Sequence, residues 1–203
     1  MAATRRIDAT DLARVAVFAA LIAVLGLPGS INIGPVPITP QTLGVMLAGA
    51  ILGPWLGALS VTVLLALVAV GLPLLAGGRG GFAVFVGPTV GYMLGWILGA
   101  IVIGLVVRIG GRIHWTTTIA GLLLGGIVAI YAVGVPFVAL IVRIPLDAAA
   151  ISSIAFIPGD LIKVAIATVV VLTLWRAYPR AFRLAPRPAP ATTAVPVIAD
   201  GQA

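Results

Sequence analysis

Three ionisable residues stand out in this chain because they interrupt long apolar runs. Only seven residues between Val15 and Trp175 carry a formal charge. Arg79 lies in a glycine-rich segment, and Asp160 and Lys163 are three residues apart, on one face of an expected helix. Such side chains are costly in apolar surroundings and usually face an interior cavity. A ligand could place a carboxylate on Arg79 or Lys163 and N–H groups on Asp160, or the last two could only stabilise the helix start and each other.

Four further residues are weaker candidates for the same site. Gly77 and Gly78 precede Arg79 and would let the backbone approach a ligand and expose amide donors, although a simple hairpin loop has the same composition. Gln41 begins the second expected helix, where capping is an alternative role. Tyr92 lies one turn into the fourth expected helix and could equally be an interfacial anchor.

Residues that carry other chemistry are scarce. The chain has no cysteine, and His114 is its single histidine and Lys163 its single lysine. No P-loop, H-E-x-x-H or G-x-S-x-G pattern occurs, so a P-loop nucleotide site, a zinc protease site and a serine hydrolase site are all excluded. We therefore expect no metal, no cofactor and no catalysis.

The composition is that of an integral membrane protein. Of 203 residues, 62% are hydrophobic and 8% charged, whereas soluble domains have about 25% charged residues. A membrane-spanning helix needs about 20 apolar residues, and Gly53-Pro54 predicts a tight antiparallel hairpin between the second and third helices. The expected fold class is an all-α membrane protein, a six-transmembrane-helix bundle. The expected spans are 10–27, 39–53, 55–73, 87–108, 115–141 and 158–178.

The positive charges predict how this bundle is oriented. They cluster at both ends of the chain and at Arg108 and Arg112, which six spans would place on one side of the membrane. The positive-inside rule then favours both termini in the cytoplasm (N-in/C-in), and the clustering does not indicate nucleic-acid binding. We expect residues 1–179 to form the membrane domain and residues 180–203 a disordered Pro/Ala/Arg-rich tail, whose arginines could bind anionic membrane lipid.

Small residues mark the faces through which the helices pack. A glycine recurs at every fourth position from 87 to 99 of the fourth span, which favours close packing within the bundle. In the first span, Ala16 and Ala20 form a face of small residues. This face could pack inside the bundle or dock onto another membrane protein.

Seven short motifs follow one another along the chain in a characteristic order. They are PITPQTLGV at 37–45, LAGA at 47–50, LGP at 52–54, GLP at 71–73, the glycine-arginine loop at 76–81, GPTxGY at 87–92 and PGDxxK at 158–163. Over about residues 8–178 the chain thereby resembles the BioY family, the biotin-specific substrate-binding (S) components of energy-coupling-factor (ECF) transporters. Pro40 departs from the family pattern, in which a bulkier apolar residue is expected, and could change how the second helix begins.

The resemblance implies a six-helix bundle in the cytoplasmic membrane of a prokaryote that captures biotin from outside. It implies three partner subunits, a transmembrane coupling protein and two cytoplasmic ATPases. By motif position, the ligand residues it implies are Arg79, Asp160 and Lys163, with Gln41, Gly77, Gly78 and Tyr92 as further candidates. It also implies that Ala16 and Ala20 dock the coupling protein.

Other classes of function remain open. A self-sufficient proton-coupled transporter of a small anionic solute would need a buried acid, for which Asp160 is the only candidate. An S component for another vitamin would share the fold and the partners. An intramembrane enzyme is the least favoured class, because the chain has one histidine, no cysteine and four serines.

Overall fold

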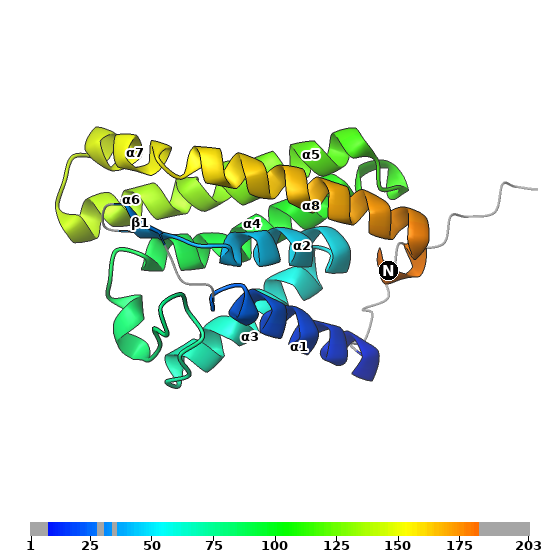
Figure 1. Cartoon of the computed structure of the whole chain (residues 1–203), viewed down its shortest axis with the longest axis horizontal. Helices are drawn as coiled ribbons and strands as arrows, with labels where there is room; N and C mark the ends of the chain where they lie inside the picture. Colours follow the sequence, from blue (N-terminus) through cyan, green and yellow to red (C-terminus); the bar gives the residue numbers. More distant parts are fainter. Residues whose placement is uncertain (1–7, 28–30, 34–35, 183–203) are drawn as a thin grey trace, which may run out of the picture.

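The computed structural model describes residues 8–27, 31–33 and 36–182, which form one elongated bundle of helices (Figure 1). The main helices are α1 (Ala9–Val24), α2 (Gln41–Leu52), α3 (Pro54–Ala69), α4 (Val90–Val107), α5 (Trp115–Leu123), α6 (Ile130–Val142), α7 (Leu146–Ile154) and α8 (Ile157–Ala177). A π-helical segment, Leu124–Ala129, joins α5 to α6 without a break. Short 3-10 helices are Phe82–Phe85, Ile109–Gly111 and Pro179–Phe182.

A helix lies in each of the six ranges expected from the sequence, and the coarse prediction of a helical membrane-type bundle is confirmed. Among the described residues, three helical segments are long and apolar enough to cross a membrane: Val90–Val107, Trp115–Val142 and Ile157–Ala177. The last two match the fifth and sixth expected spans closely. The second is shorter than expected, since α2 has 12 residues and rises only about 18 Å at 1.5 Å per residue.

Two elements were not expected. Residues after α1 form a short antiparallel hairpin of β1 (Ile31–Ile33) and β2 (Val36–Ile38), so the chain is not purely α-helical. The helix α7 fills the connection between the fifth and sixth expected spans. It follows a left-handed residue, Arg143 (φ 58°), which ends α6.

The helix α4 is the centre of the bundle. It packs against α2, α3, α5 and α6. Within its apolar stretch of 18 residues, 61% of the residues are buried, against 28% in such a stretch of Trp115–Val142 and 22% in one of α8. The glycines of α4 make this possible: a Cβ at Gly95 would lie 2.8 Å from the Ile130 carbonyl oxygen, and one at Gly99 would lie 2.7 Å from that of Gly125. The prediction that the glycine stripe serves packing within the bundle is therefore confirmed for Gly91, Gly95 and Gly99, whereas Gly87 lies before α4 and makes no such close contact.

The predicted hairpin between α2 and α3 is also confirmed. Gly53 joins the two helices with φ 94°, and Pro54 occupies the first turn of α3, where its missing N–H has no cost. Arg108, at the end of α4, donates hydrogen bonds to the carbonyl oxygens of Ala50 (3.0 Å) and Ile51 (2.8 Å). A cation thus satisfies carbonyls that the end of α2 leaves free.

The folded region extends beyond the domain boundary expected at residue 179. The segment Pro179–Phe182 folds back onto the bundle, and Phe182 is 1% exposed with its ring 5.4 Å from that of Trp175. Arg14 and Arg108 donate hydrogen bonds to the carbonyls of Ala181 and Phe182 (both 3.3 Å). The structure thus places residues 180–182 against the bundle, and the rest of the expected tail, from 183 onward, lies outside the described residues.

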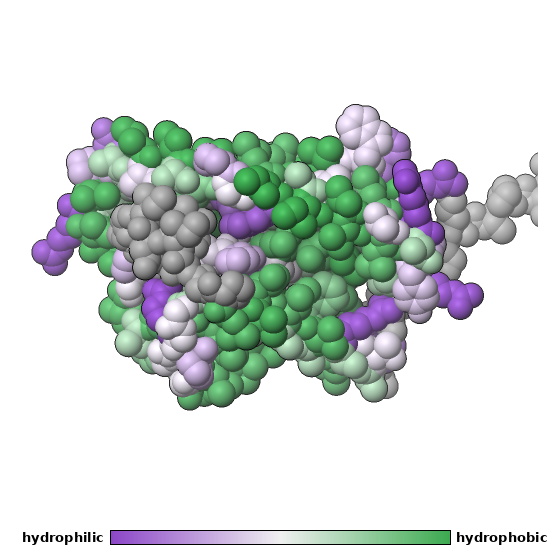
Figure 2. Space-filling model, viewed as in Figure 1, coloured by the Kyte–Doolittle hydropathy of each residue, from purple (hydrophilic) through white to green (hydrophobic). Residues whose placement is uncertain are grey.

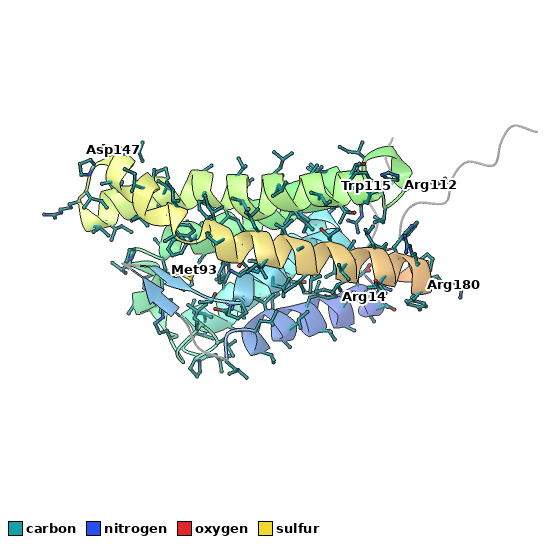
Figure 3. The ribbon with its side chains drawn as sticks, turned by 45° about the horizontal axis from the view of Figure 1, so that its top comes forward. Arg14, Met93, Arg112, Trp115, Asp147 and Arg180 are labelled. Atoms are coloured by element: carbon teal, nitrogen blue, oxygen red, sulfur yellow. The ribbon has the colours of Figure 1, made fainter. Side chains whose placement is uncertain are left out.

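The surface agrees with a membrane environment. Figure 2 shows hydrophobic residues over most of the length of the bundle and hydrophilic residues toward both ends, with a further hydrophilic patch between them. Figure 3 shows Arg14, Arg112, Trp115 and Arg180 at one end, Asp147 at the opposite end, and Met93 nearer to Asp147. The starts of α1 and α5 and the end of the described chain therefore share one end of the molecule.

Candidate functional site

A pocket lies among α2, α4, α6, α8 and the glycine-arginine loop. Its empty volume, which includes open solvent at the mouth, is about 630 Å³. Five of the seven predicted ligand residues line it: Gln41, Arg79, Tyr92, Asp160 and Lys163. The other lining residues are Thr39, Thr42, Leu75, Thr89, Met93, Trp96, Gly126, Ile130, Tyr131 and Phe156.

The charged pair of α8 is the polar centre of this pocket. Lys163 Nζ lies 2.8 Å from Asp160 Oδ1 and donates a second hydrogen bond, also 2.8 Å, to Thr42 Oγ1 on α2. The hydroxyl of Tyr131 on α6 donates to Asp160 Oδ2 at 2.6 Å. Two further helices thus hold the pair in place, and each carboxylate oxygen keeps a lone pair for a ligand.

Arg79 is held by a tight turn. Leu75 and Arg79 exchange two backbone hydrogen bonds (3.0 and 3.2 Å) across Gly77 and Gly78, whose φ angles are 74° and 70°. These positive angles explain why two glycines stand there. The Arg79 side chain is exposed, donates through Nε to the Ala76 carbonyl (3.2 Å) and has no carboxylate partner in the described part of the chain. Gly77 and Gly78 shape the turn but do not line the pocket.

Gln41 lies in the pocket lining but is itself buried, with 1% of its surface exposed. Its amide nitrogen donates to the carbonyls of Ile22 (3.3 Å) and Leu74 (3.1 Å), and its oxygen accepts from the Ala76 N–H (3.2 Å). The alternative of helix capping is wrong, because no side chain caps the start of α2. The amide instead bonds to two separate segments of backbone, the end of α1 and the loop at 74–76.

Tyr92 contributes its ring to the pocket wall, while its hydroxyl is already paired. The hydroxyl oxygen lies 2.7 Å from Oγ of Ser153 on α7. The ring packs edge-on against Tyr131 (centroids 5.8 Å apart) and Phe156 (6.1 Å). Together these contacts connect α4, α6 and α7 at the pocket.

The sequence analysis missed part of the pocket wall. Thr89 and Trp96 lie three and four residues from Tyr92, so helical spacing from that residue would have found them, and Met93 is its immediate neighbour. Tyr131 carried no such signal. It follows the π-helical segment Leu124–Ala129, whose wider turns change the direction in which later side chains point, and π-turns are frequent at functional sites.

The predicted docking residues lie apart from the pocket. Ala16 and Ala20 are on the exposed face of α1, whereas Val15, Ala19 and Ile22 on the opposite face are buried in the bundle. The alternative that Ala16 and Ala20 pack inside the bundle is therefore wrong.

The site is suited to binding rather than to reaction. It combines a buried ion pair, an exposed arginine and apolar or aromatic walls from Met93, Trp96 and Ile130. Among the described residues there is no group of three or more His, Cys, Asp or Glu side chains that could hold a metal ion. A helical bundle with such a surface and such a pocket is a membrane-embedded binding protein for a small polar molecule.

Comparison with known proteins identifies the family. The BioY family matches residues 1–180, and the chain belongs to this family. It is 44% identical to the biotin transporter BioY of Rhizobium etli, over 83% of this chain and 95% of the relative. It is 46% identical to the biotin transporter BioY of Rhodobacter capsulatus, over 82% and 94%. The chain is accordingly a multi-pass membrane protein.

The fold has a solved counterpart. The crystal structure of the S-component for biotin from an ECF-type ABC transporter superposes with a TM-score of 0.80 at 38% identity, covering 86% of this chain and 96% of that chain. The S-component fold predicted from the sequence motifs is thereby confirmed.

Proposed function

We propose that this protein captures biotin and takes part in its uptake as the substrate-binding component of an ECF transporter. The observation that carries the proposal is a single pocket that combines the buried Asp160–Lys163 pair, the exposed Arg79 and apolar walls. Biotin has the matching parts: a ureido head with two N–H donors and a carbonyl, an apolar sulfur-containing ring and a carboxylate. The names of the relatives support the same ligand.

The ion pair of α8 suits the ureido head. A carboxylate accepts N–H donors, and Asp160 keeps free lone pairs although Lys163 and Tyr131 already donate to it. An ammonium has three donors, of which Lys163 uses two, on Asp160 and Thr42. Its third donor can reach the ureido carbonyl. Because the pair is largely shielded from solvent, hydrogen bonds to it are stronger than they would be in water.

Arg79 suits the carboxylate of the ligand. It has no carboxylate partner among the described residues, and only its Nε is engaged, by the Ala76 carbonyl. The terminal nitrogens of the guanidinium can form a forked pair of hydrogen bonds with a carboxylate. The glycine-rich turn leaves room for this approach, since a Cβ at Gly77 or Gly78 would meet nothing within 4 Å.

The bundle is proposed to cross the cytoplasmic membrane of a prokaryote six times, with both termini inside. The crossings are α1, α2, α3, α4, α5 with α6, and α8. Arg14, Arg112 and Arg180 lie at one end of the molecule (Figure 3), and the positive-inside rule assigns that end to the cytoplasm. The pocket then opens toward the outside, where the vitamin is captured.

The energy for transport must come from other subunits or from a gradient, because the sequence has no P-loop. We propose a transmembrane coupling protein and two cytoplasmic ATPases as partners. The exposed Ala16–Ala20 face of α1 is the proposed dock, since small residues let helix backbones approach closely in a membrane. The expectation that the chain is not an enzyme agrees with its membership of a family whose relatives are named transporters.

Titration calorimetry on the purified protein in detergent tests the ligand, with thiamine and riboflavin as controls. We expect tight, selective binding of one biotin per chain. Selective binding of thiamine or riboflavin would point to an S component for another vitamin. No binding of any of the three, together with proton-driven solute accumulation in liposomes that contain this protein alone, would favour a self-sufficient secondary transporter and overturn the proposal.

A further inference from the structure

The buried amide of Gln41 connects the end of α1 to the loop that carries Arg79. Its nitrogen donates to the Ile22 carbonyl of α1 and to the Leu74 carbonyl of the loop, and its oxygen accepts from the Ala76 N–H. Both N–H donors of the amide are therefore used by backbone, and its oxygen has one lone pair left. The side chain of Gln41 therefore has no N–H donor left for a direct hydrogen bond to a ligand.

The end of α1 needs such a partner. Within the last turn of a helix the carbonyls lack intrahelical donors. Here the N–H of Gly26, four residues after Ile22, bonds to the Ala23 carbonyl instead, so the Ile22 carbonyl is left for Gln41. A buried carbonyl without a donor would cost free energy, which explains a polar side chain at a position that is 1% exposed.

Two glycines make room for the amide. A Cβ at Gly26 would lie 2.9 Å from both Cδ and Nε2 of Gln41, and a Cβ at Gly44 would lie 2.9 Å from Cγ1 of Ile22. Both contacts are closer than real Cβ atoms come to their neighbours. The side chain of Gln41 and the close approach of α1 to α2 therefore depend on glycine at these two positions.

One residue of the loop, Ala76, is hydrogen-bonded to both Gln41 and Arg79. Ala76 gives its N–H to Gln41 and accepts the Arg79 Nε–H on its carbonyl. The guanidinium, which carries the proposed contact with the ligand carboxylate, thus donates to the carbonyl of the same residue whose N–H is bonded to Gln41.

We propose that Gln41 is a positioning residue, which fixes the glycine-arginine loop to the end of α1 and acts on the ligand through Arg79. This replaces the role expected from the sequence, in which Gln41 binds the ligand itself. The positioning of the loop is independent of the ligand, whereas the effect on binding rests on the proposed function.

Hydrogen–deuterium exchange of the full chain in detergent, without ligand, tests the positioning. In Gln41→Leu, which keeps the bulk but removes the amide, we expect the Ala76 N–H and the loop at 72–81 to exchange about tenfold faster, because a buried hydrogen bond is lost. The control is Ser60→Ala, at a fully buried serine that bonds only within its own helix, and it should leave the loop unchanged. Unchanged exchange in Gln41→Leu would overturn the proposal.

Biotin affinity gives the second readout, through a double-mutant cycle with Arg79→Ala. If Gln41 acts through Arg79, Gln41→Leu weakens binding about tenfold in the otherwise natural protein but less than twofold when Arg79 is already alanine. If the loss of affinity in the double variant equals the product of the losses in the two single variants, Gln41 acts independently of Arg79, which would contradict the proposal. The exchange measurement needs no ligand, so it distinguishes a failure of this proposal from a failure of the proposed function.

A second variant covers the case in which Gln41→Leu does not fold. Gly26→Ala keeps Gln41 but places a methyl group against its amide. We expect the same local increase in exchange at Ala76, and an unchanged loop in a folded Gly26→Ala protein would likewise contradict the proposal.

Discussion

Lys163 and Asp160 face each other across one turn of α8, with Nζ 2.8 Å from Oδ1 and only 12% and 8% of the two side chains exposed. A pair this deeply shielded is held by its neighbours as much as by its own attraction, since removal of water from two charges offsets most of the Coulomb energy. Thr42 and Tyr131 supply the hydrogen bonds that complete it. Loss of one member would leave the other charge buried and unpaired.

This arrangement predicts that stability and binding respond differently to the same substitutions. Asp160→Asn and Lys163→Met should each lower the free energy of unfolding by about 3 kcal/mol, and the double variant should regain part of that loss because no charge remains unpaired. Biotin binding should be lost in all three. Thermal unfolding and calorimetry would measure the two effects, and a double variant no more stable than the singles would contradict the explanation.

Arg79 should interact with the carboxylate of the ligand and with no other part of the ligand. Arg79→Ala should weaken biotin binding at least about tenfold, from the loss of charge-assisted hydrogen bonds, and should weaken binding of biotin methyl ester much less. Calorimetry with both ligands measures the difference. Arg176→Ala, an exposed arginine at the other end of α8, is the control; an equal loss for the ester would argue against the proposed contact.

Replacement of each pocket tyrosine by phenylalanine removes only a hydroxyl, but the two substitutions should differ in their effect on biotin affinity. Tyr131→Phe removes a hydrogen bond to Asp160 and should weaken biotin binding several-fold, in line with about 1 kcal/mol for such a bond. Tyr92→Phe removes a bond to Ser153 instead and should change affinity less while it destabilises the contact with α7. Equal effects on affinity would show that the hydroxyl of Tyr131 does not act through the ion pair.

Phe182 should be part of the folded domain. Phe182→Ala empties a site that is 1% exposed and removes the contact with Trp175, so we expect a loss of about 3 kcal/mol in the free energy of unfolding. Truncation after residue 182 should cost far less than truncation after residue 178. Thermal unfolding of the three proteins in detergent measures this, and equal stability of both truncated chains would contradict it.

The exposed alanine face of α1 should matter for transport but not for capture. Ala16→Trp and Ala20→Trp prevent close helix approach, so ATP-driven biotin uptake in a reconstituted system with the coupling protein and ATPases should fall at least about tenfold. Biotin affinity should not change. Val169→Trp, on an exposed part of α8, is the control for a bulky residue facing lipid, and uptake that survives both alanine substitutions would exclude this face as the dock.

Much of the fold followed from the sequence alone, because its signals are local. Apolar runs bounded by Pro, Gly and charge predicted the helices, and Gly53-Pro54 predicted the α2–α3 hairpin. Local signals did not predict α7 or the β1–β2 hairpin, because both elements are short. They also did not predict that Phe182 folds back onto the bundle, because this depends on its contact with Trp175 and on the hydrogen bonds that Arg14 and Arg108 donate to the carbonyls of Ala181 and Phe182.

The chemistry of the site was likewise set by residue type, and its geometry by packing. Spacing in the sequence already put Asp160 and Lys163 on one helix face and marked Arg79 by its glycines. Only the tertiary structure showed that Tyr131 donates to Asp160 and that the amide of Gln41 bonds to the backbone of α1 and of the loop. The physical reason is that these hydrogen bonds join residues 19 to 35 positions apart. Such contacts depend on how close glycines allow the helices to come, which no local pattern of residues specifies.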